Sequence, residues 1–320
     1  MNKLIIICGP TSTGKTSLGI KLCRKFDGEI ISADSRQLFK YMDIGTGKKP
    51  AISRMKGTVP NHVVGEGFWV VGGIYIHLYD VVEPDRKFSV ARFKDAATKE
   101  IESIWRRQKI PFLVGGTGFY LAAVLGETEL PRISPDWELR KELEKLSTEE
   151  LFEKIQKLDP ERAKTIDPKN PRRLVRAIEV AAADSSEPRS DGGIRARLFP
   201  SSAKVLKIGL TAPREVLYDR ADRWAEAIVN NGLLDEVRDL TNRGYKNTAP
   251  MQGIIYKTAA DHLDGEITKE EMLQKIKFDL HGYIRRQLTW FKRDKEIKWF
   301  DLTESDFEKK VEKMVKSYLK

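Results

Sequence analysis

The chain has 320 residues, of which 40% are hydrophobic, so it can form one large domain or a core with a smaller second unit. Its two cysteines, Cys8 and Cys23, lie in apolar stretches like small core residues, which argues against a disulfide framework or a cysteine metal site. The net charge of +10 favours an anionic partner, with nucleic acid first, although a lysine-rich solvated surface would give the same balance.

The first predicted element is a buried parallel strand at residues 4–8, a continuous apolar run. This run is too short for the hydrophobic region of a signal peptide or for a membrane span. We therefore expect a cytoplasmic protein without a membrane partner. A helix is expected next, because Leu18, Leu22 and Phe26 recur at a spacing of four.

Between this strand and helix lies a segment that fits the phosphate-loop pattern G-x-x-x-x-G-K-[ST]. The glycines of such a loop let the backbone approach phosphate, and its N–H groups and the helix N-terminus attract the anion. The lysine would reach terminal phosphate oxygens, and the following threonine would offer its hydroxyl to Mg²⁺. A glycine-rich turn without a ligand is the alternative. The predicted phosphate-binding residues are Gly9, Pro10, Thr11, Ser12, Thr13, Gly14, Lys15 and Thr16.

A second short strand is predicted at residues 29–35, and it ends in polar residues that include Asp34. Side chains at the carboxyl ends of strands in such folds face the ligand crevice, so we expect Asp34 near the phosphate loop. The alternative is that Asp34 only caps the next helix. Residues 36–47 are predicted to be partly helical and then to form a glycine-bounded turn.

Residues 48–73 are predicted to be irregular, and residues 74–82 to form a strand. Ser89 is the expected N-cap of a helix with an apolar stripe reaching Ile104. A buried strand at residues 110–114 follows, and a glycine-rich turn ends it. Thr117 lies in that turn and is a candidate for the same crevice, with a simple turn role as the alternative.

The character of the chain changes between about residues 131 and 197, where strand signals vanish and short helical patterns dominate. Asn170 and Pro171 are expected to open one of these helices as N-cap and first residue. Arg172, Arg173 and Arg176 gather in its first two turns, against the helix dipole. They indicate an anionic partner, with a solvated basic face as the alternative. Residues 185–202 are predicted to be a flexible connection.

Residues 205–210 restore the strand signal, and helices are predicted at residues 213–231 and 233–242. Thr268 and Glu271 form a capping-box pair for a long final helix. The expected fold class is therefore α/β: a parallel sheet like that of P-loop NTPases, flanked by helices. Residues 1–130 and 198–320 would form its catalytic core, and residues 131–197 a helical insertion domain.

Several segments together resemble one family, tRNA dimethylallyltransferase, in order and with suitable spacing over residues 4 to about 299. This family transfers a dimethylallyl group from its diphosphate to N6 of adenosine 37, next to the tRNA anticodon, and uses Mg²⁺. The resemblance implies that the phosphate loop cradles an isoprenoid diphosphate and not ATP. The segments are residues 9–16, 31–37, 42–47, 115–120, 170–180 and 286–291.

The resemblance also implies a role for each matching residue. The adenine amine is a poor nucleophile, and Asp34 would accept its proton. Thr117 would lie near the bridging oxygen, Lys15 and Arg220 would hold the diphosphate, and Thr16 the metal ion. Target-base extrusion fits an enzyme that acts on a base atom. The implied tRNA-binding residues are Asp34, Ser35, Arg36, Gln37, Thr117, Arg140, Arg172, Arg173, Leu174, Val175 and Arg176.

The sequence departs from the family pattern at Ile255, Thr258, Leu280 and His281, and in the spacing from Arg220 to Arg223. The sequence shows no cysteine pattern like that of the C-terminal zinc finger of eukaryotic relatives, so the bacterial type is the closer match. A monomer is expected. Three alternatives stay open at this point. They are an isopentenyltransferase acting on free adenine nucleotides, a P-loop kinase of a small metabolite, and a non-catalytic nucleic-acid-binding protein.

Overall fold

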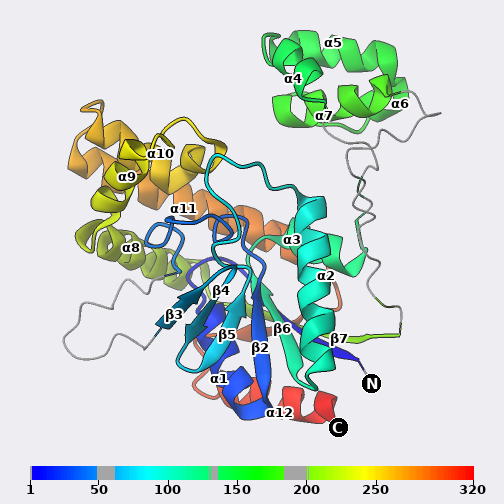
Figure 1. The fold of residues 1–320 in the computed structure, drawn as a ribbon, viewed down its shortest axis with the longest axis vertical. Helices are drawn as coiled ribbons and strands as arrows, with labels where there is room; N and C mark the ends of the chain where they lie inside the picture. Colours follow the sequence, from blue (N-terminus) through cyan, green and yellow to red (C-terminus); the bar gives the residue numbers. More distant parts are fainter. Residues whose placement is uncertain (1, 49–61, 129, 131–135, 184–199, 201) are drawn as a thin grey trace. The chain divides into compact units, whose positions relative to one another are not determined.

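The computed structural model describes residues 2–48, 62–128, 130, 136–183, 200 and 202–320. Backbone contacts divide the chain into two compact units, residues 1–128 with 196–320 and residues 129–195. The first unit contains the whole sheet, and the second contains only helices (Figure 1). No helix among the described residues is long and apolar enough to span a membrane.

The eight strands form one sheet in the order β3-β4-β5-β2-β6-β1-β7-β8. The five pairings from β5 to β8 are parallel, whereas β3, β4 and β5 pair antiparallel. Strand β1 is central, so both of its faces must be covered. The strands are β1 (Lys3–Cys8), β2 (Gly28–Ser32), β3 (His62–Gly65), β4 (Phe68–Val71), β5 (Ile74–His77), β6 (Ile110–Gly115), β7 (Lys204–Thr211) and β8 (Lys298–Asp301).

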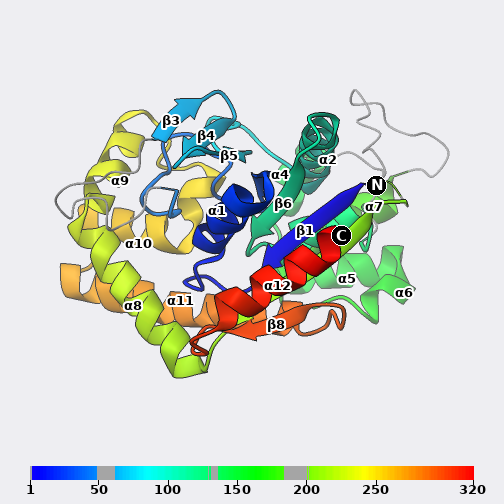
Figure 2. The same ribbon diagram turned by 90° about the horizontal axis from the view of Figure 1, so that it is seen from below.

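Helices cover both faces of this sheet, which explains the continuous apolar run of β1. Leu4 and Ile6 point to one face and pack with α2 (Val90–Arg106) and α3 (Gly118–Leu125). Ile5 and Ile7 point to the other face and pack with α1 (Lys15–Phe26) and α12 (Phe307–Leu319). Figure 2 shows α1 and α12 on their shared face. The architecture is the predicted α/β sheet flanked by helices.

A further helical layer of the first unit has its own apolar core. Phe39 and Met42, from the connection after β2, are part of this core. The helical layer therefore packs directly against the segment that follows Asp34. The capping box predicted for the long helix is present, with Glu271 N–H donating to the Thr268 hydroxyl at 3.2 Å. The elements are α8 (Arg214–Asn230), α9 (Leu233–Asn242), the 3₁₀ helix η1 (Ala249–Gln252), α10 (Ile254–Leu263) and α11 (Lys269–Phe291).

The second unit is a small helical bundle with a separate core that includes Leu151, Ile155 and Ile178. As predicted, Asn170 caps its last helix by accepting a hydrogen bond from the Arg173 N–H at 3.2 Å, and Pro171 is the first helical residue. Its helices are α4 (Trp137–Leu143), α5 (Thr148–Leu158), α6 (Pro160–Ala163) and α7 (Pro171–Ala182).

The structure corrects the local predictions in four places. Residues 62–71, predicted to be irregular, form the β3–β4 hairpin, whose turn contains Gly67 at φ 77°. Residues 36–47 form successive turns and no helix. Strand β5 ends at His77, and α10, β8 and α12 had no predicted counterpart. Most of the predicted flexible connection, residues 184–199 and 201, lies outside the described residues.

Candidate active site

Three loops meet at the carboxyl edge of the sheet because their strands are neighbours. Cys8 of β1 is paired with Gly115 of β6, and Ser32 of β2 with Val114 of β6. The pairing continues past β2, since Ala33 N–H donates to the Val114 carbonyl at 2.8 Å. The phosphate loop after β1, the segment after β2 and the turn after β6 therefore border one crevice.

The phosphate loop has the backbone that its glycines require. Gly9 has φ 135°, and a Cβ there would overlap the backbone carbonyl oxygen of Leu210 in β7. Gly14, at φ 77°, leads directly into α1. The Arg220 Nε of α8 donates to the Ser12 carbonyl at 2.8 Å, which brings the predicted diphosphate clamp against the loop.

Several polar groups of this loop are disposed to bind an anion. The Ser12 hydroxyl is buried and has no hydrogen-bond partner among the described residues. The Lys15 Nζ donates to the Pro10 carbonyl at 2.7 Å. Burial lowers the pKa of the Lys15 amine to about 8, and the negative charge of Asp34 partly opposes this shift. A phosphate oxygen near Lys15 would offset the free-energy cost of that desolvation.

Asp34 and Thr117 lie next to each other at the crevice. The Ser35 N–H donates to the Thr117 hydroxyl at 3.2 Å, and the Arg36 N–H donates to Asp34 Oδ1 at 2.8 Å. Asp34 thus makes the turn-capping contact that was the alternative to a catalytic role, through one of its two oxygens. Thr117 makes no side-chain capping bond to α3, so its hydroxyl is not required by that helix.

Three buried tyrosines lie near enough to Asp34 for its negative charge to act on them. Burial raises the pKa values of Tyr79, Tyr120 and Tyr283, and the charge of Asp34 raises each of them further. For Tyr283, the Thr117 side chain partly opposes the rise in pKa. These tyrosines stay protonated near neutral pH, so Asp34 is the basic group of this cluster.

Gln287 of α11 joins two of the loops and was not among the predicted site residues. Its side chain is 6% exposed. Its Oε1 accepts a hydrogen bond from the Thr11 N–H at 2.8 Å, and its Nε2 donates to the Gly116 carbonyl at 2.9 Å. A Cβ at Gly116 would overlap the Gln287 amide, which gives a physical reason for that glycine. Gln287 therefore positions the phosphate loop against the turn that carries Thr117.

The segment after Asp34 is held by its own side chains. The Ser32 hydroxyl donates to Gln37 Oε1 at 2.7 Å, and Gln37 Nε2 donates to the Thr46 carbonyl at 3.1 Å. The predicted tRNA-binding amide of Gln37 is thus engaged within the protein. Arg36 is part-exposed, and its guanidinium lies 3.4 Å from the carbonyls of Ala249 and Pro250 in η1.

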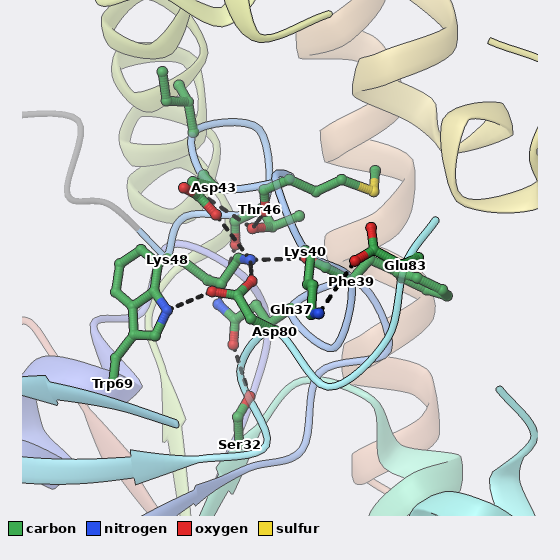
Figure 3. A network of polar contacts seen from close by, with 12 residues as sticks. Ser32, Gln37, Phe39, Lys40, Asp43, Thr46, Lys48, Trp69, Asp80 and Glu83 are labelled. Atoms are coloured by element: carbon green, nitrogen blue, oxygen red, sulfur yellow. Dashed lines mark hydrogen bonds and ion pairs between the residues drawn. The ribbon is translucent and has the colours of Figure 1, made fainter. Parts of the chain in front are cut away.

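A buried ion-pair network fixes the end of the same segment, as Figure 3 shows. The fully buried Lys48 ammonium pairs with Asp80 and, at 2.9 Å, with Asp43. It also donates to the Phe39 carbonyl at 2.8 Å, and the Trp69 indole N–H donates to Asp80. Since Asp80 follows β5, this network ties the segment to the sheet.

Glu236 of α9 secures residues 43–45 from the opposite side. Its carboxylate accepts the backbone N–H groups of Asp43, Ile44 and Gly45 at 2.9, 2.7 and 3.1 Å, and the Tyr256 hydroxyl at 2.7 Å. Burial raises the pKa of this carboxyl, and the hydrogen bonds oppose the rise. The later part of the site segment is therefore anchored by two separate buried charges, Lys48 and Glu236.

The arginines of the helical unit fall into two groups, those that pair with a buried glutamate and those that are exposed. Glu179 is buried and receives a two-pronged contact from Arg140, at 2.7 and 2.6 Å, and a contact from Arg176 at 3.1 Å. Arg172 and Arg173 are exposed. Leu174 and Val175 are 0% and 7% exposed and belong to the core of the unit, so the predicted tRNA contacts cannot come from their side chains. Arg140 and Arg176 stabilise the bundle.

Protein-family models and curated proteins match almost the whole chain. The model described as IPP transferase matches residues 37–294, and the one described as isopentenyl transferase matches residues 2–66. The tRNA dimethylallyltransferase of Halalkalibacterium halodurans is 39% identical over 97% of this chain and 94% of that protein. The enzyme of that name from Roseiflexus castenholzii is 42% identical over 92% of this chain and 90% of that protein.

The chain belongs to the tRNA dimethylallyltransferase family. A solved structure agrees with this. The crystal structure of the full-length tRNA isopentenylpyrophosphate transferase from Bacillus halodurans superposes with a TM-score of 0.68 and 36% identity, and the match covers 100% of this chain and 97% of that one. The P-loop-like fold predicted from the phosphate-loop motif is that of this family.

The residues of the loop fit a divalent cation. The Thr16 hydroxyl makes no hydrogen bond within the described parts of the chain, so it is available to a cation bound together with an anionic ligand. A second place where carboxylates gather is the cluster of Glu127, Asp294 and Glu296, but a lysine already balances its negative charge. The Lys207 ammonium lies 2.6, 2.7 and 2.8 Å from these carboxylates, so we assign the cluster to charge compensation and not to a metal ion.

The departures from the family pattern have local structural explanations. Arg223 pairs with Asp219 on its own helix at 2.5 Å and is not directed at the loop by any contact in the described chain. His281 contacts Asp222 at 2.7 Å and stacks on Tyr218 at 3.9 Å, which joins α11 to α8. The remaining departures, Leu280, Ile255 and Thr258, pack into or beside the core of the helical layer.

We expect replacement of Gln287 by Met to raise the KM for dimethylallyl diphosphate by about tenfold, because the variant keeps the volume but loses both hydrogen bonds, each worth roughly 0.5–1.5 kcal/mol. Steady-state kinetics and tRNA affinity would be measured together. Gln252→Met, at an exposed position of η1, is the matched control. An unchanged KM, or an equal loss of tRNA affinity, would refute the positioning role of Gln287.

Proposed function

We propose that this protein transfers a dimethylallyl group from dimethylallyl diphosphate to N6 of adenosine 37, next to the anticodon of tRNA. Membership of the tRNA dimethylallyltransferase family makes it a tRNA-prenylating enzyme. The observation that carries the detailed proposal is the meeting of the phosphate loop, Asp34 and Thr117 in one crevice. The free-nucleotide and kinase alternatives are not favoured, because the near-full-length relatives are named as tRNA enzymes.

The donor diphosphate would lie on the phosphate loop. Its oxygens would accept from the loop N–H groups and the Ser12 hydroxyl, and Lys15 and Arg220 would neutralise its charge. Thr16 would hold Mg²⁺, which stabilises the charge on the leaving diphosphate. Lys15 and Arg220 donate to carbonyl oxygens of the loop and form no ion pair with any described residue. The Ser12 hydroxyl has no hydrogen-bond partner among these residues. These groups are therefore available to an anionic ligand.

The transfer forms one bond and breaks one. The N6 lone pair attacks C1 of the dimethylallyl group, and the C1–O bond to diphosphate breaks, with the electron pair leaving on oxygen. The N6 proton passes to the carboxylate of Asp34, because the nearby tyrosines have raised pKa values and stay protonated. Thr117 would donate to a diphosphate oxygen as its charge grows. Gln287 would hold the two loops in register.

For the tRNA, we propose contacts from both units. Ser35 and Arg36 would meet the target nucleotide, since they border Thr117 and Asp34. Residues 131–197 would bind the anticodon arm through the exposed Arg172 and Arg173. We further propose a cytoplasmic monomer.

We expect Arg172→Ala with Arg173→Ala to weaken tRNA binding and to reduce the salt slope of log K by about 0.7 to 0.9 for each phosphate that the protein no longer neutralises. Donor KM should not change. Arg176→Ala should instead lower thermal stability, because it removes one of the two arginines that pair with the buried Glu179. Replacement of Lys154 and Lys157 on α5 removes equal charge and serves as control. Equal weakening in that control would show a general charge effect and contradict the assignment.

The test of function is incubation of the protein with tRNA, dimethylallyl diphosphate and Mg²⁺, followed by nucleoside analysis. We expect N6-dimethylallyladenosine in the tRNA, and none in a tRNA variant that carries another base at position 37. Parallel reactions contain AMP in place of tRNA, or ATP as the phosphate donor. Product in the AMP reaction without product in tRNA would overturn the proposal.

A further inference from the structure

A surface of the first unit combines an exposed tyrosine, a part-buried tyrosine and an arginine, and the site described above does not use it. We call Tyr41, Arg243 and Tyr245 the stacking surface. The Arg243 guanidinium carbon lies 4.4 Å from the centroid of the Tyr41 ring. The rings of Tyr41 and Tyr245 are nearly parallel, with centroids 6.4 Å apart and planes inclined by 15°. The Tyr41 side chain is 38% exposed.

Tyr41 holds this position at a conformational cost. Its φ of 65° lies in the left-handed region, which a bulky side chain rarely adopts. Buried packing does not account for the residue, because the ring is exposed and its hydroxyl reaches Glu83 only at 3.4 Å. Strain of this kind in a surface residue is a reason to look for a function of the side chain.

Arg243 keeps hydrogen-bonding capacity on this surface. Its Nε donates to Asp239 at 2.7 Å, and its side chain is 45% exposed. Its terminal nitrogens make no hydrogen bond or ion pair with any described residue. The guanidinium therefore lies over an aromatic ring, while its terminal nitrogens stay available to a ligand as far as the described residues are concerned.

The stacking surface is continuous with the proposed active site. Tyr41 lies in the same connection after β2 as Asp34 and Arg36. Arg36 contacts the carbonyls of Ala249 and Pro250, a few residues beyond Tyr245. Residues 36–41 and 243–250 therefore run beside each other, from the crevice to this surface.

We infer that the stacking surface binds an unpaired nucleobase of the tRNA substrate, close to the base that enters the crevice. This inference rests on the proposed function. Aromatic rings and arginine planes are the usual platforms for unpaired bases in RNA, and an extruded adenosine leaves its neighbours in the loop unstacked. The cationic Arg243 suits the polyanionic partner, in a chain of net charge +10.

The experiment measures binding of an anticodon stem-loop RNA without donor, by fluorescence anisotropy. Tyr41→Gly removes the ring at a backbone angle that glycine prefers, and Arg243→Gln removes the charged plane. We expect each variant to weaken binding at least fivefold, since stacking of one base is worth about 1–3 kcal/mol. Tyr41→Phe keeps the ring and should bind like the unmodified protein.

Arg238→Gln is the matched control for charge, because Arg238 lies on the same helix, is 55% exposed and pairs with Asp235. Equal weakening in Arg238→Gln and Arg243→Gln would overturn the inference in favour of general electrostatics. Unchanged binding in Tyr41→Gly would overturn it as well. Failure of the proposed function is recognised separately, because the unmodified protein would then make no dimethylallyladenosine in tRNA.

Discussion

Asp34→Asn is expected to lower the turnover rate by on the order of 10²-fold or more, the loss typical of a missing general base. The asparagine side-chain oxygen can still accept the hydrogen bond from the Arg36 N–H, which is 2.8 Å long for Asp34. The turn after β2 is therefore preserved, while the carboxylate that we propose as the acceptor of the N6 proton is gone. Single-turnover rates with saturating tRNA and donor would measure the effect.

Comparison with Asp34→Ala separates catalysis from turn capping. Both variants should be equally slow if Asp34 is the base, and Ala should also lower the melting temperature. Asp27→Asn is the control for the same chemical change at the opposite end of β2, where the side chain is 79% exposed. Near-normal turnover in Asp34→Asn together with a slow Asp34→Ala would mean that Asp34 only caps the turn.

Thr117→Val should lower turnover by about 10²- to 10³-fold, because a preorganised donor to a developing oxyanion is worth roughly 2.7–4 kcal/mol. Valine keeps the shape of threonine and deletes the hydroxyl. The helix α3 should not suffer, since Thr117 makes no side-chain capping bond to it. The Ser35 N–H does lose its acceptor, so the tRNA affinity of the variant must be measured beside its turnover.

Thr117→Ser shows whether the hydroxyl or the methyl group of Thr117 is needed for turnover. It should retain much of the activity, because the donor survives. Thr98→Val is the control for the substitution itself, because the Thr98 hydroxyl is buried in α2 without a partner among the described residues. Equal losses in Thr117→Val and Thr117→Ser would show that the methyl group packs the turn and that the hydroxyl has no catalytic part.

The sequence alone predicted the elements whose signals are local. The strand, loop and helix of the phosphate site are encoded by adjacent residues, and so are the Asn170 cap and the Thr268–Glu271 capping box. Asp34 and Thr117 could be placed because parallel strands end at a common edge. The β3–β4 hairpin was missed, since short antiparallel strands outside the buried parallel core carry a weaker pattern.

Side-chain partners were decided only by the tertiary structure. Gln287 lies 276 positions from Thr11 in the chain, and no local pattern near either residue indicates their hydrogen bond. Arg140 and Arg176 resemble basic RNA contacts in the sequence, whereas in the structure both pair with the buried Glu179. Local patterns determine which backbone forms, because those energies come from neighbouring residues. Pairing between distant side chains depends on how the helices pack, and that information is spread over the whole chain.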